Sequence, residues 1–424
     1  MHIKSIEIKG LYGTFNYYIE MKRESNLCVL TGLNGYGKTT ILNMIHSLCN
    51  KEEIYYFHKI PFRNINVVFD NSAQLEIRKV ELSHPVEDDR QIFSEETTDF
   101  SLIQNDRKIA FFRITEEDYE NSSYFKKLQR KKDKVNHLLF MWEHKHEGEV
   151  VQVVDQNLDR LYMMLSSLHD TFISSQRLFS ENYERNDEDD RKPMLDKVLD
   201  TLQDILKNNY FSFLQYSQKR DSNFIDVLLS TSETLSEKDY NAKAATLYIQ
   251  IEELINYGLL PKTRIRPYDD KHVRELTAYI KELELKLAQY NSLRKKLNLF
   301  TKLLAEKHFV NKEFKFTRKD GLRVWLPKSN MFLSDIYNLS SGEQNEIILL
   351  CKLIFEVPDG SILLIDEPEL SLHVAWQLQF INDIKAISKN RDIQIIIATH
   401  SAAIVSESLE DCYDLTDQNS KENG

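Results

Sequence analysis

A glycine-rich loop near the N-terminus has the spacing of a phosphate-binding site. Residues 32–39 match the pattern GxxxxGK[ST]; the apolar stretch LCVLT precedes them and the helical stretch TILNMIHSL follows. Glycines in such a loop let main-chain N–H groups turn inward around phosphate oxygens, and the helix N-terminus adds partial positive charge. A purely structural glycine turn is the alternative. We expect the phosphates of a nucleotide to be bound by Asn34, Gly35, Gly37, Lys38, Thr39 and Thr40.

Two acids at the end of a second apolar stretch are the expected partners of this loop. Residues 362–368 read ILLIDEP, an apolar run typical of a buried parallel strand that ends in Asp366 and Glu367. Ligands bind at the carboxyl ends of strands in an open α/β sheet, so both acids should emerge beside the loop. The Thr39 hydroxyl and Asp366 would hold Mg²⁺, and Glu367 would orient and deprotonate the attacking water. A turn at the sheet edge is the alternative.

The next apolar stretch, IQIIIATHS, ends in a histidine that should lie at the same edge of the sheet as the two acids. A histidine at a strand tip is often only a surface or capping residue. The parallel with the preceding strand instead directs His400 into the cleft that holds Lys38, where it could sense the γ-phosphate. We therefore expect a catalytic role for His400.

A second small-residue loop could also bind phosphate. Ser340, Ser341, Gly342 and Glu343 precede the helical stretch NEIILLCKLIF, and a helix N-terminus with free N–H groups suits an anion. Its alternative role is a plain N-cap. One nucleotide does not need two such loops, so this one would cover the nucleotide of a second subunit. We expect a homodimer or a higher even-numbered homo-oligomer.

The order of these motifs resembles that of the ABC-type ATPases. LSSGEQ is similar to their signature loop, ILLIDEP to their Walker B strand and ATHS to their histidine switch. ELSLH resembles the D-loop, with His373 where transporters carry aspartate, which favours the SMC, RecF and OLD branch. The resemblance covers residues 1–60 and 310–405. Within the branch, the chain looks most similar to the stand-alone ATPase subunits of bacterial anti-phage systems such as PARIS and Septu.

The resemblance also implies a glutamine that contacts Mg²⁺ and the attacking water. In ABC-type ATPases it ends a strand that leads into the helical subdomain. Gln176 occupies that place in this sequence, and Gln74 is a weaker candidate. An exposed loop glutamine is the alternative for Gln176.

Short strands and long helices must position these residues. The 424 residues suggest two or three domains, and only 11 are glycine, which favours helices over a many-stranded fold. Stretches such as IKSIEIKG, FNYYIEM and NINVVFDN predict a strand-rich N-terminal lobe, and EFKFT and LRVWL predict a hairpin that turns at Gly321. We expect an α/β P-loop NTPase with an ABC-type strand-rich lobe and a mixed central sheet. The ATPase would comprise residues 1–180 and 311–424, interrupted by a helical insertion at 181–310.

The insertion contains a long stretch without glycine or proline, from Asp269 to His308. Its apolar residues recur at alternating steps of three and four, except for a doubled three at Tyr290–Leu293. This pattern predicts one coiled-coil-like helix roughly 60 Å long that projects from the core. Two or three shorter helices in an ordinary bundle are the alternative.

Charge and hydropathy exclude several classes of protein. The net charge of −11 argues against a chain that coats nucleic acid or anionic lipid indiscriminately. No apolar run approaches the ~20 residues that span a bilayer, and the four cysteines lack paired spacing. We expect free thiols, no membrane contact and a cytoplasmic location.

A basic stretch, Lys126–Lys134, could contact DNA or an acidic phage protein; a solvated helix face is the alternative. A second basic cluster, residues 294–296, has the same two interpretations.

The OLD nucleases carry a Toprim domain after the ATPase, whereas this sequence ends 24 residues after His400. The resemblance thus implies an ATP hydrolase that senses and regulates in anti-phage defence, with a separate Toprim- or HNH-like nuclease from the same operon as effector. The alternative is a RecF- or SMC-like repair ATPase that binds DNA through its basic helical insertion.

Overall fold

A computed structural model describes most of the chain. It covers residues 1–85, 92–126, 161, 163, 165, 168–175, 194–307, 309–317, 319–370, 372–389 and 391–420. The chain forms two compact units. The first joins Met1–Ser175 to Val357–Gly424, and the second is Gln176–Glu356.

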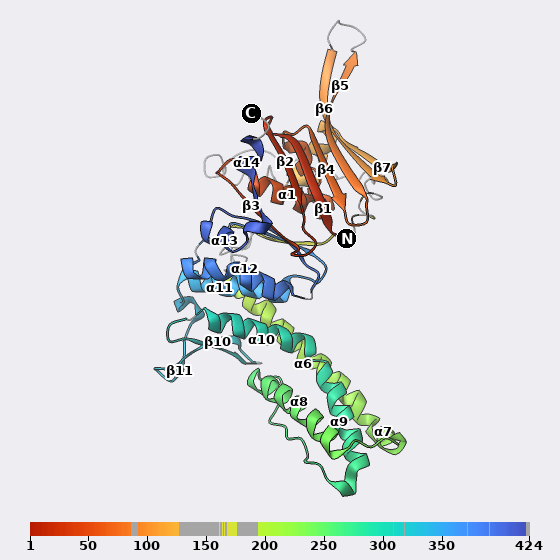
Figure 1. Cartoon of the computed structure of the whole chain (residues 1–424), viewed down its shortest axis with the longest axis vertical. Helices are drawn as coiled ribbons and strands as arrows, with labels where there is room; N and C mark the ends of the chain where they lie inside the picture. The colour runs from red at the N-terminus through yellow and green to blue at the C-terminus, as the bar shows by residue number, and fades with distance from the viewer. Residues whose placement is uncertain are drawn as a thin grey trace, which may run out of the picture. The chain divides into compact units, whose positions relative to one another are not determined.

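The first unit contains an antiparallel sheet of six strands, in the order β2-β1-β4-β5-β6-β7 (Figure 1). Alternation along each strand turns one face to the core: in β4, Ile65, Val67 and Phe69 are buried while the residues between them are half-buried. The predicted strand-rich lobe is therefore confirmed. Its strands are β1 (Ile3–Leu11), β2 (Phe15–Glu20), β4 (Asn64–Phe69), β5 (Gln74–Pro85), β6 (Ile92–Gln104) and β7 (Arg107–Ile114).

A second sheet of five parallel strands, in the order β14-β3-β13-β12-β8, supports the loop and the acids. Its three central strands are buried almost throughout, as their continuous apolar runs predict. In register, Asp366 lies beside Ala398, and Ala398 lies beside Leu30, so three strands end at one edge. The strands are β3 (Leu27–Thr31), β8 (Asp170–Ile173), β12 (Ile362–Asp366), β13 (Gln394–Ala398) and β14 (Cys412–Asp414).

Helices complete this unit. The first of them, α1, buries Ile41, Leu42 and Ile45 and contacts the parallel strands β8, β12 and β13. Packing on three strands fixes the start of α1, and with it the end of the glycine loop. The helices are α1 (Lys38–Cys49), α2 (Tyr56–Lys59), α3 (Glu116–Asn121), α12 (Val374–Ser388), α13 (Ala402–Ser406) and α14 (Leu415–Ser420).

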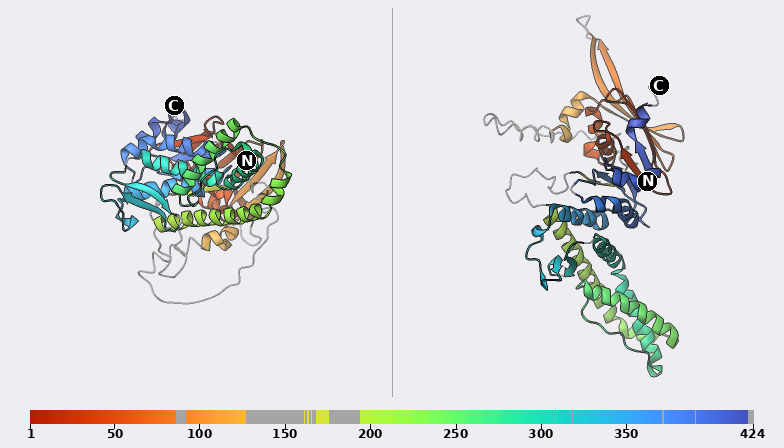
Figure 2. Two further views of the ribbon diagram at one scale, coloured as in Figure 1. Left: turned by 90° about the horizontal axis from the view of Figure 1, so that it is seen from below. Right: turned by 60° about the vertical axis from the view of Figure 1, so that its left-hand side comes forward.

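The second unit is mostly helical. Helices α6, α8 and α9 run side by side (Figures 1 and 2), and α6 also packs on a small sheet of order β11-β10-β9. The predicted hairpin turns at Gly321, where φ is +66°. The elements are α6 (Met194–Ser222), α7 (Phe224–Ser230), α8 (Glu237–Asn256), α9 (Val273–Ala288), α10 (Asn291–Glu306), β9 (Glu313–Thr317), β10 (Gly321–Leu326), β11 (Met331–Phe332), α11 (Ser341–Cys351) and a π-helical turn (Lys352–Glu356).

The prediction of one uninterrupted helix from Asp269 to His308 is wrong. Helix α9 ends at Ala288 and α10 begins at Asn291, so the break falls at the doubled three-residue step. There Tyr290 is fully buried and its ring stacks on Phe213 of α6, with ring centroids 4.7 Å apart. The two shorter helices can each turn their own apolar stripe to the bundle, which one straight helix with a phase slip cannot.

The fold class agrees with the sequence: an α/β chain with a parallel sheet, an antiparallel sheet and much helix. Antiparallel and parallel pairs lie in separate sheets. Residues 311–356, expected with the ATPase part, lie in the second unit because their hairpin and α11 pack on α6 and α10. All four cysteines are free. In the part of the chain that the structure describes, no helix is long and apolar enough to cross a membrane.

Candidate nucleotide-binding site

The glycine loop has a backbone conformation that residues with a side chain rarely adopt. Gly35 and Gly37 have φ of +88° and +82°, in the left-handed region that favours glycine. A Cβ on Gly37 would also lie 2.9 Å from Cδ2 of Leu11, so a side chain at this position would have to displace Leu11 as well as adopt an unfavourable φ. Asn34 and Gly35 are exposed at the tip of the loop. The chain thus reserves an open, main-chain-lined turn in front of α1, which suits an anion.

Lys38 begins α1 and turns back over this loop. Its ammonium donates hydrogen bonds to the carbonyl oxygens of Gly32 and Leu33, at 2.9 and 3.1 Å, and the residue is only 6% exposed. Burial lowers the pKa of Lys38, while the nearby carboxylates of Glu367 and Asp366 act in the opposite direction. The two carbonyl oxygens are neutral acceptors. A phosphate in the loop would give this poorly solvated ammonium an anionic acceptor, which binds it more strongly.

Thr39 and Asp366 meet across the edge of the parallel sheet. The Thr39 hydroxyl lies 3.1 Å from Oδ1 and 3.2 Å from Oδ2 of Asp366, to which it donates. Burial raises the pKa of Asp366, as do the charges of Glu367 and Glu369, and the hydrogen bond from Thr39 opposes the rise. Thr40, the next residue, pairs its hydroxyl with that of Tyr12 at 2.7 Å.

The Thr39–Asp366 pair fits Mg²⁺. Its donors are a hydroxyl and a carboxylate, which are hard oxygen ligands, and a buried carboxylate with a raised pKa gains most from a cation. The described residues contain no cluster of three or more His, Cys, Asp or Glu side chains that could hold a metal. A magnesium ion bound through nucleotide phosphates needs only one or two protein ligands, so this pair is sufficient.

Glu367 and His400 face each other beside the pair. Glu367 has φ of +45°, unusual for a residue with a Cβ, and its N–H donates to the carbonyl of Ala398 at 2.8 Å. That bond joins the ends of β12 and β13. Oε1 of Glu367 lies 3.9 Å from Nε2 of His400, and both side chains are about one-third exposed. Left-handed backbone at such a residue is a strained arrangement of the kind found at functional sites.

The structure describes only one of the two candidate glutamines. Gln176 lies outside the described residues, as does the basic stretch Lys126–Lys134 apart from Lys126. Gln74 begins β5 of the antiparallel sheet, where it is exposed.

The small-residue loop lies in the second unit, at the start of α11. Ser340 and Glu343 form a capping box: the Ser340 hydroxyl accepts from the N–H of Glu343, and the Glu343 carboxylate accepts from the N–H of Ser340. Glu343 also pairs with Lys312 at 2.6 Å. Burial alone would raise the pKa of Glu343, but Lys312 and Ser340 lower it overall. Ser341 is exposed, and its hydroxyl has no partner among the described residues.

The sequence analysis missed Glu369, which connects the acidic loop to the histidine loop. Its Oε1 accepts from the His400 N–H at 2.7 Å, and its Oε2 accepts from the Thr399 hydroxyl at 2.8 Å. Thr399 is completely buried. A second link runs beside it, because Ser401 donates to Gln377 at 2.7 Å. The acid at position 369 is visible in DEPEL, but its partners lie 30 residues further on, so only the fold shows the connection.

These features define a nucleotide-binding ATPase of the P-loop type: a glycine loop before a helix, and a carboxylate pair on a neighbouring parallel strand. The sequence matches the family described as AAA ATPase domain over residues 1–405, so the chain belongs to that family. No curated protein matches the sequence.

Among solved structures, the chain is similar to head domains of SMC proteins. One is the Smc head with an extended coiled coil bound to the C-terminal domain of ScpA from Pyrococcus furiosus: 13% identity, 96% of this chain, 91% of that chain and a TM-score of 0.35. Another is the SMC head from Thermotoga maritima, with 12% identity, 96% and 92% coverage and a TM-score of 0.32. These scores are too low for the likeness to bear on function.

Proposed function

We propose that the chain is an ATP hydrolase whose active site lies in the first unit. The observation that supports this is the meeting of Lys38, Thr39, Asp366, Glu367 and His400 at the carboxyl edge of the parallel sheet. Each residue type matches a task in phosphoryl transfer, which depends on positioning and charge stabilisation more than on covalent chemistry.

The proposed roles follow from position. Lys38 leaves its loop carbonyls and binds the β- and γ-phosphates, and the loop N–H groups surround them. Thr39 and Asp366 hold Mg²⁺, which neutralises charge on the phosphate oxygens. Glu367 orients the attacking water and takes its proton, and His400 contacts the γ-phosphate. Gln176 is proposed to assist Mg²⁺ and the water.

We further propose that ATP joins two copies of the chain, with residues 340–343 of one copy covering the nucleotide of the other. The exposed Ser341 at the N-terminus of an 11-residue helix supports this, because its hydroxyl is available to a ligand.

Ser341→Arg is expected to abolish steady-state hydrolysis, by at least about 100-fold, while ATP binding to the single chain is unchanged. The long cation would block contact with a partner, yet disturbs no hydrogen bond of the described structure. Phosphate release and equilibrium ATP binding, measured on the same samples, test this. Ser329→Arg, at another exposed serine of the second unit, is the matched control. Full turnover by Ser341→Arg would contradict the composite site.

Glu369 is expected to position the two catalytic loops. Glu369→Ala leaves the buried Thr399 hydroxyl and the His400 N–H without their acceptor, at a cost of about 1–3 kcal/mol each. We expect kcat to fall at least about 10-fold with KM for ATP nearly unchanged, because Lys38 and its loop are untouched. Glu369→Gln should restore kcat, since a carboxamide can accept from the N–H and donate to a rotated Thr399 hydroxyl. If Glu369→Gln lowers kcat as much as Glu369→Ala, turnover depends on the charge of Glu369 and not on its positioning of the two loops.

The finer role that we propose is that of a sensor and regulatory scaffold in bacterial anti-phage defence, acting on a separate nuclease. The resemblance of LSSGEQNEIILL and DEPELSLHVAWQ to the ATPases of such systems supports it. Co-expression with the operon neighbours, followed by affinity purification and phage plating, tests it. Co-elution with a nuclease and protection lost in Lys38→Ala are expected. Recombination genes as neighbours, with no protection, would favour the DNA repair alternative.

A further inference from the structure

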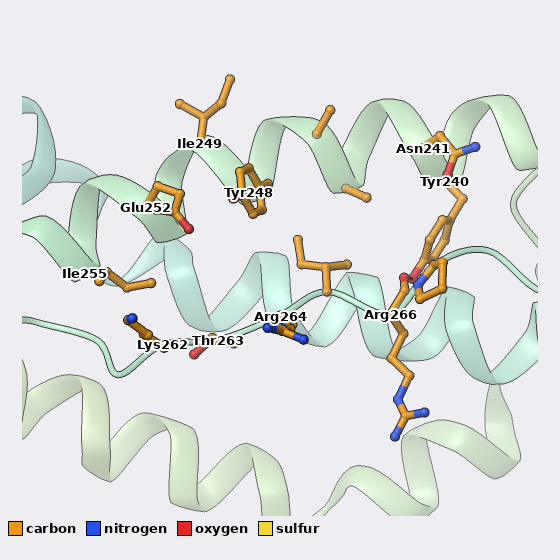
Figure 3. A pocket seen from close by; sticks show the side chains of 14 residues that line it. Tyr240, Asn241, Tyr248, Ile249, Glu252, Ile255, Lys262, Thr263, Arg264 and Arg266 are labelled. Atoms are coloured by element: carbon orange, nitrogen blue, oxygen red, sulfur yellow. Dashed lines mark hydrogen bonds between the residues drawn. The ribbon is translucent and has the colours of Figure 1, made fainter.

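A groove in the second unit is lined by none of the residues assigned to ATP. It runs between α8 and residues 262–267 and has a volume of about 870 Å³ (Figure 3). Ala244, Ala245, Tyr248 and Ile249 line it from the middle of α8, and the last three are exposed. Asn241 and Glu252 line it one turn to either side. Helix α8 therefore exposes an apolar patch in the middle of its outer face, between a polar and an acidic residue, in addition to its apolar core face.

Residues 262–267, the extended basic segment, form the other wall. Exposure alternates along it: Lys262, Arg264 and Arg266 are exposed, whereas Thr263 and Ile265 are half-buried. This period of two is that of an extended chain, and it places three cations on one side with no acid between them. Figure 3 shows Arg264 across from Tyr248 of α8, and Arg266 beside Tyr240 with its guanidinium directed away from α8.

Among the described residues, a single hydrogen bond holds the main chain of the segment. The Tyr240 hydroxyl donates to the carbonyl oxygen of Arg266 at 2.7 Å. The main-chain N–H groups of residues 262–266 have no acceptor among the described residues. An extended chain with unpaired main-chain groups can pair with another extended chain, in the manner of an added β-strand.

We propose that this groove docks an extended acidic peptide segment of a partner protein. The peptide pairs its main chain with residues 262–266, points one set of alternate side chains at the apolar face of α8, and directs the other set, Asp or Glu, to Lys262, Arg264 and Arg266. The apolar wall and the unpaired main chain favour a peptide over nucleic acid. The site does not depend on ATP hydrolysis, so the two proposals can fail separately.

Fluorescence anisotropy of the full chain with a labelled probe tests the proposal. The probe is an eight-residue peptide in which glutamate alternates with valine and threonine. We expect saturable binding, with a dissociation constant at or below about 100 μM, and at least ~10-fold weaker binding when the four glutamates are contiguous. Arg264→Glu combined with Arg266→Glu should weaken binding at least about 10-fold. The matched control is Lys295→Glu with Lys302→Glu, an equal charge change elsewhere in the unit, which should bind as wild type.

A second variant keeps the test independent of charge. Ala245→Met retains helix propensity but fills the groove, so it should also weaken binding about 10-fold. Phosphate release by each variant reports whether the ATPase unit remains active. The proposal is overturned by no saturable binding up to ~1 mM, by equal binding of the contiguous-glutamate peptide, or by tighter binding of a labelled ten-nucleotide oligothymidylate that competes at the same residues.

Discussion

Lys38→Ala is expected to abolish ATP binding, with affinity reduced at least about 100-fold and turnover at background. The lysine would make charge-assisted bonds to two phosphates, each worth about 1.5–3 kcal/mol. Alanine keeps the start of α1 but leaves those phosphates without a cation. Isothermal titration of Mg²⁺–ATP into each protein measures the loss. Lys59→Ala, at an exposed lysine of the same unit, is the control.

The same variant separates loss of function from loss of fold. Burial lowers the pKa of Lys38 in the folded chain, so its charge costs stability at any pH below that folded pKa. Lys38→Ala should therefore unfold, without nucleotide, at the same temperature as wild type or higher. Retained ATP affinity in a folded Lys38→Ala protein would contradict the assignment of the phosphate loop.

Glu367→Gln is expected to bind ATP yet reduce turnover by about 10²–10⁴-fold, the contribution typical of a general base. A carboxamide can still orient water but cannot accept its proton. Because hydrolysis would release the partner copy, the variant should accumulate as an ATP-bound dimer. Phosphate release and light scattering coupled to size-exclusion chromatography, each with Mg²⁺–ATP, measure the two effects.

Glu407→Gln makes the same chemical change at an exposed site of the first unit and should behave as wild type. Turnover by Glu367→Gln at the wild-type rate would place the base on another residue. Loss of ATP binding in this variant would show instead that Glu367 supports the loop that surrounds Lys38.

Most of the first unit could be predicted because its signals are local. The apolar runs of β3, β12 and β13 are long enough to identify buried strands, and glycines at 35 and 37 mark a loop whose left-handed backbone favours glycine. Parallel strands then bring their carboxyl ends to one edge by geometry alone. That rule predicts that Thr39 and Asp366 lie close together, as they do at 3.1 Å.

The second unit was harder to predict because packing overrides periodicity there. The apolar stripe from Asp269 to His308 reads as one helix, but Tyr290 has a stacking partner on α6, and the chain breaks where that contact is made. The division into two units also depends on contacts between distant segments, such as those of α11 with α6. Glu369 was missed for the same reason, since Thr399 and His400 become its neighbours only after folding.

Steady-state phosphate release by the purified wild-type chain, with and without Mg²⁺ and beside Lys38→Ala prepared in the same way, tests the central claim most directly. If the residues around Lys38 and Asp366 form an ATPase site, the wild type releases phosphate only with Mg²⁺, and Lys38→Ala remains at background. The claim would be contradicted if the two proteins released phosphate at the same rate, or if the wild-type homodimer released none.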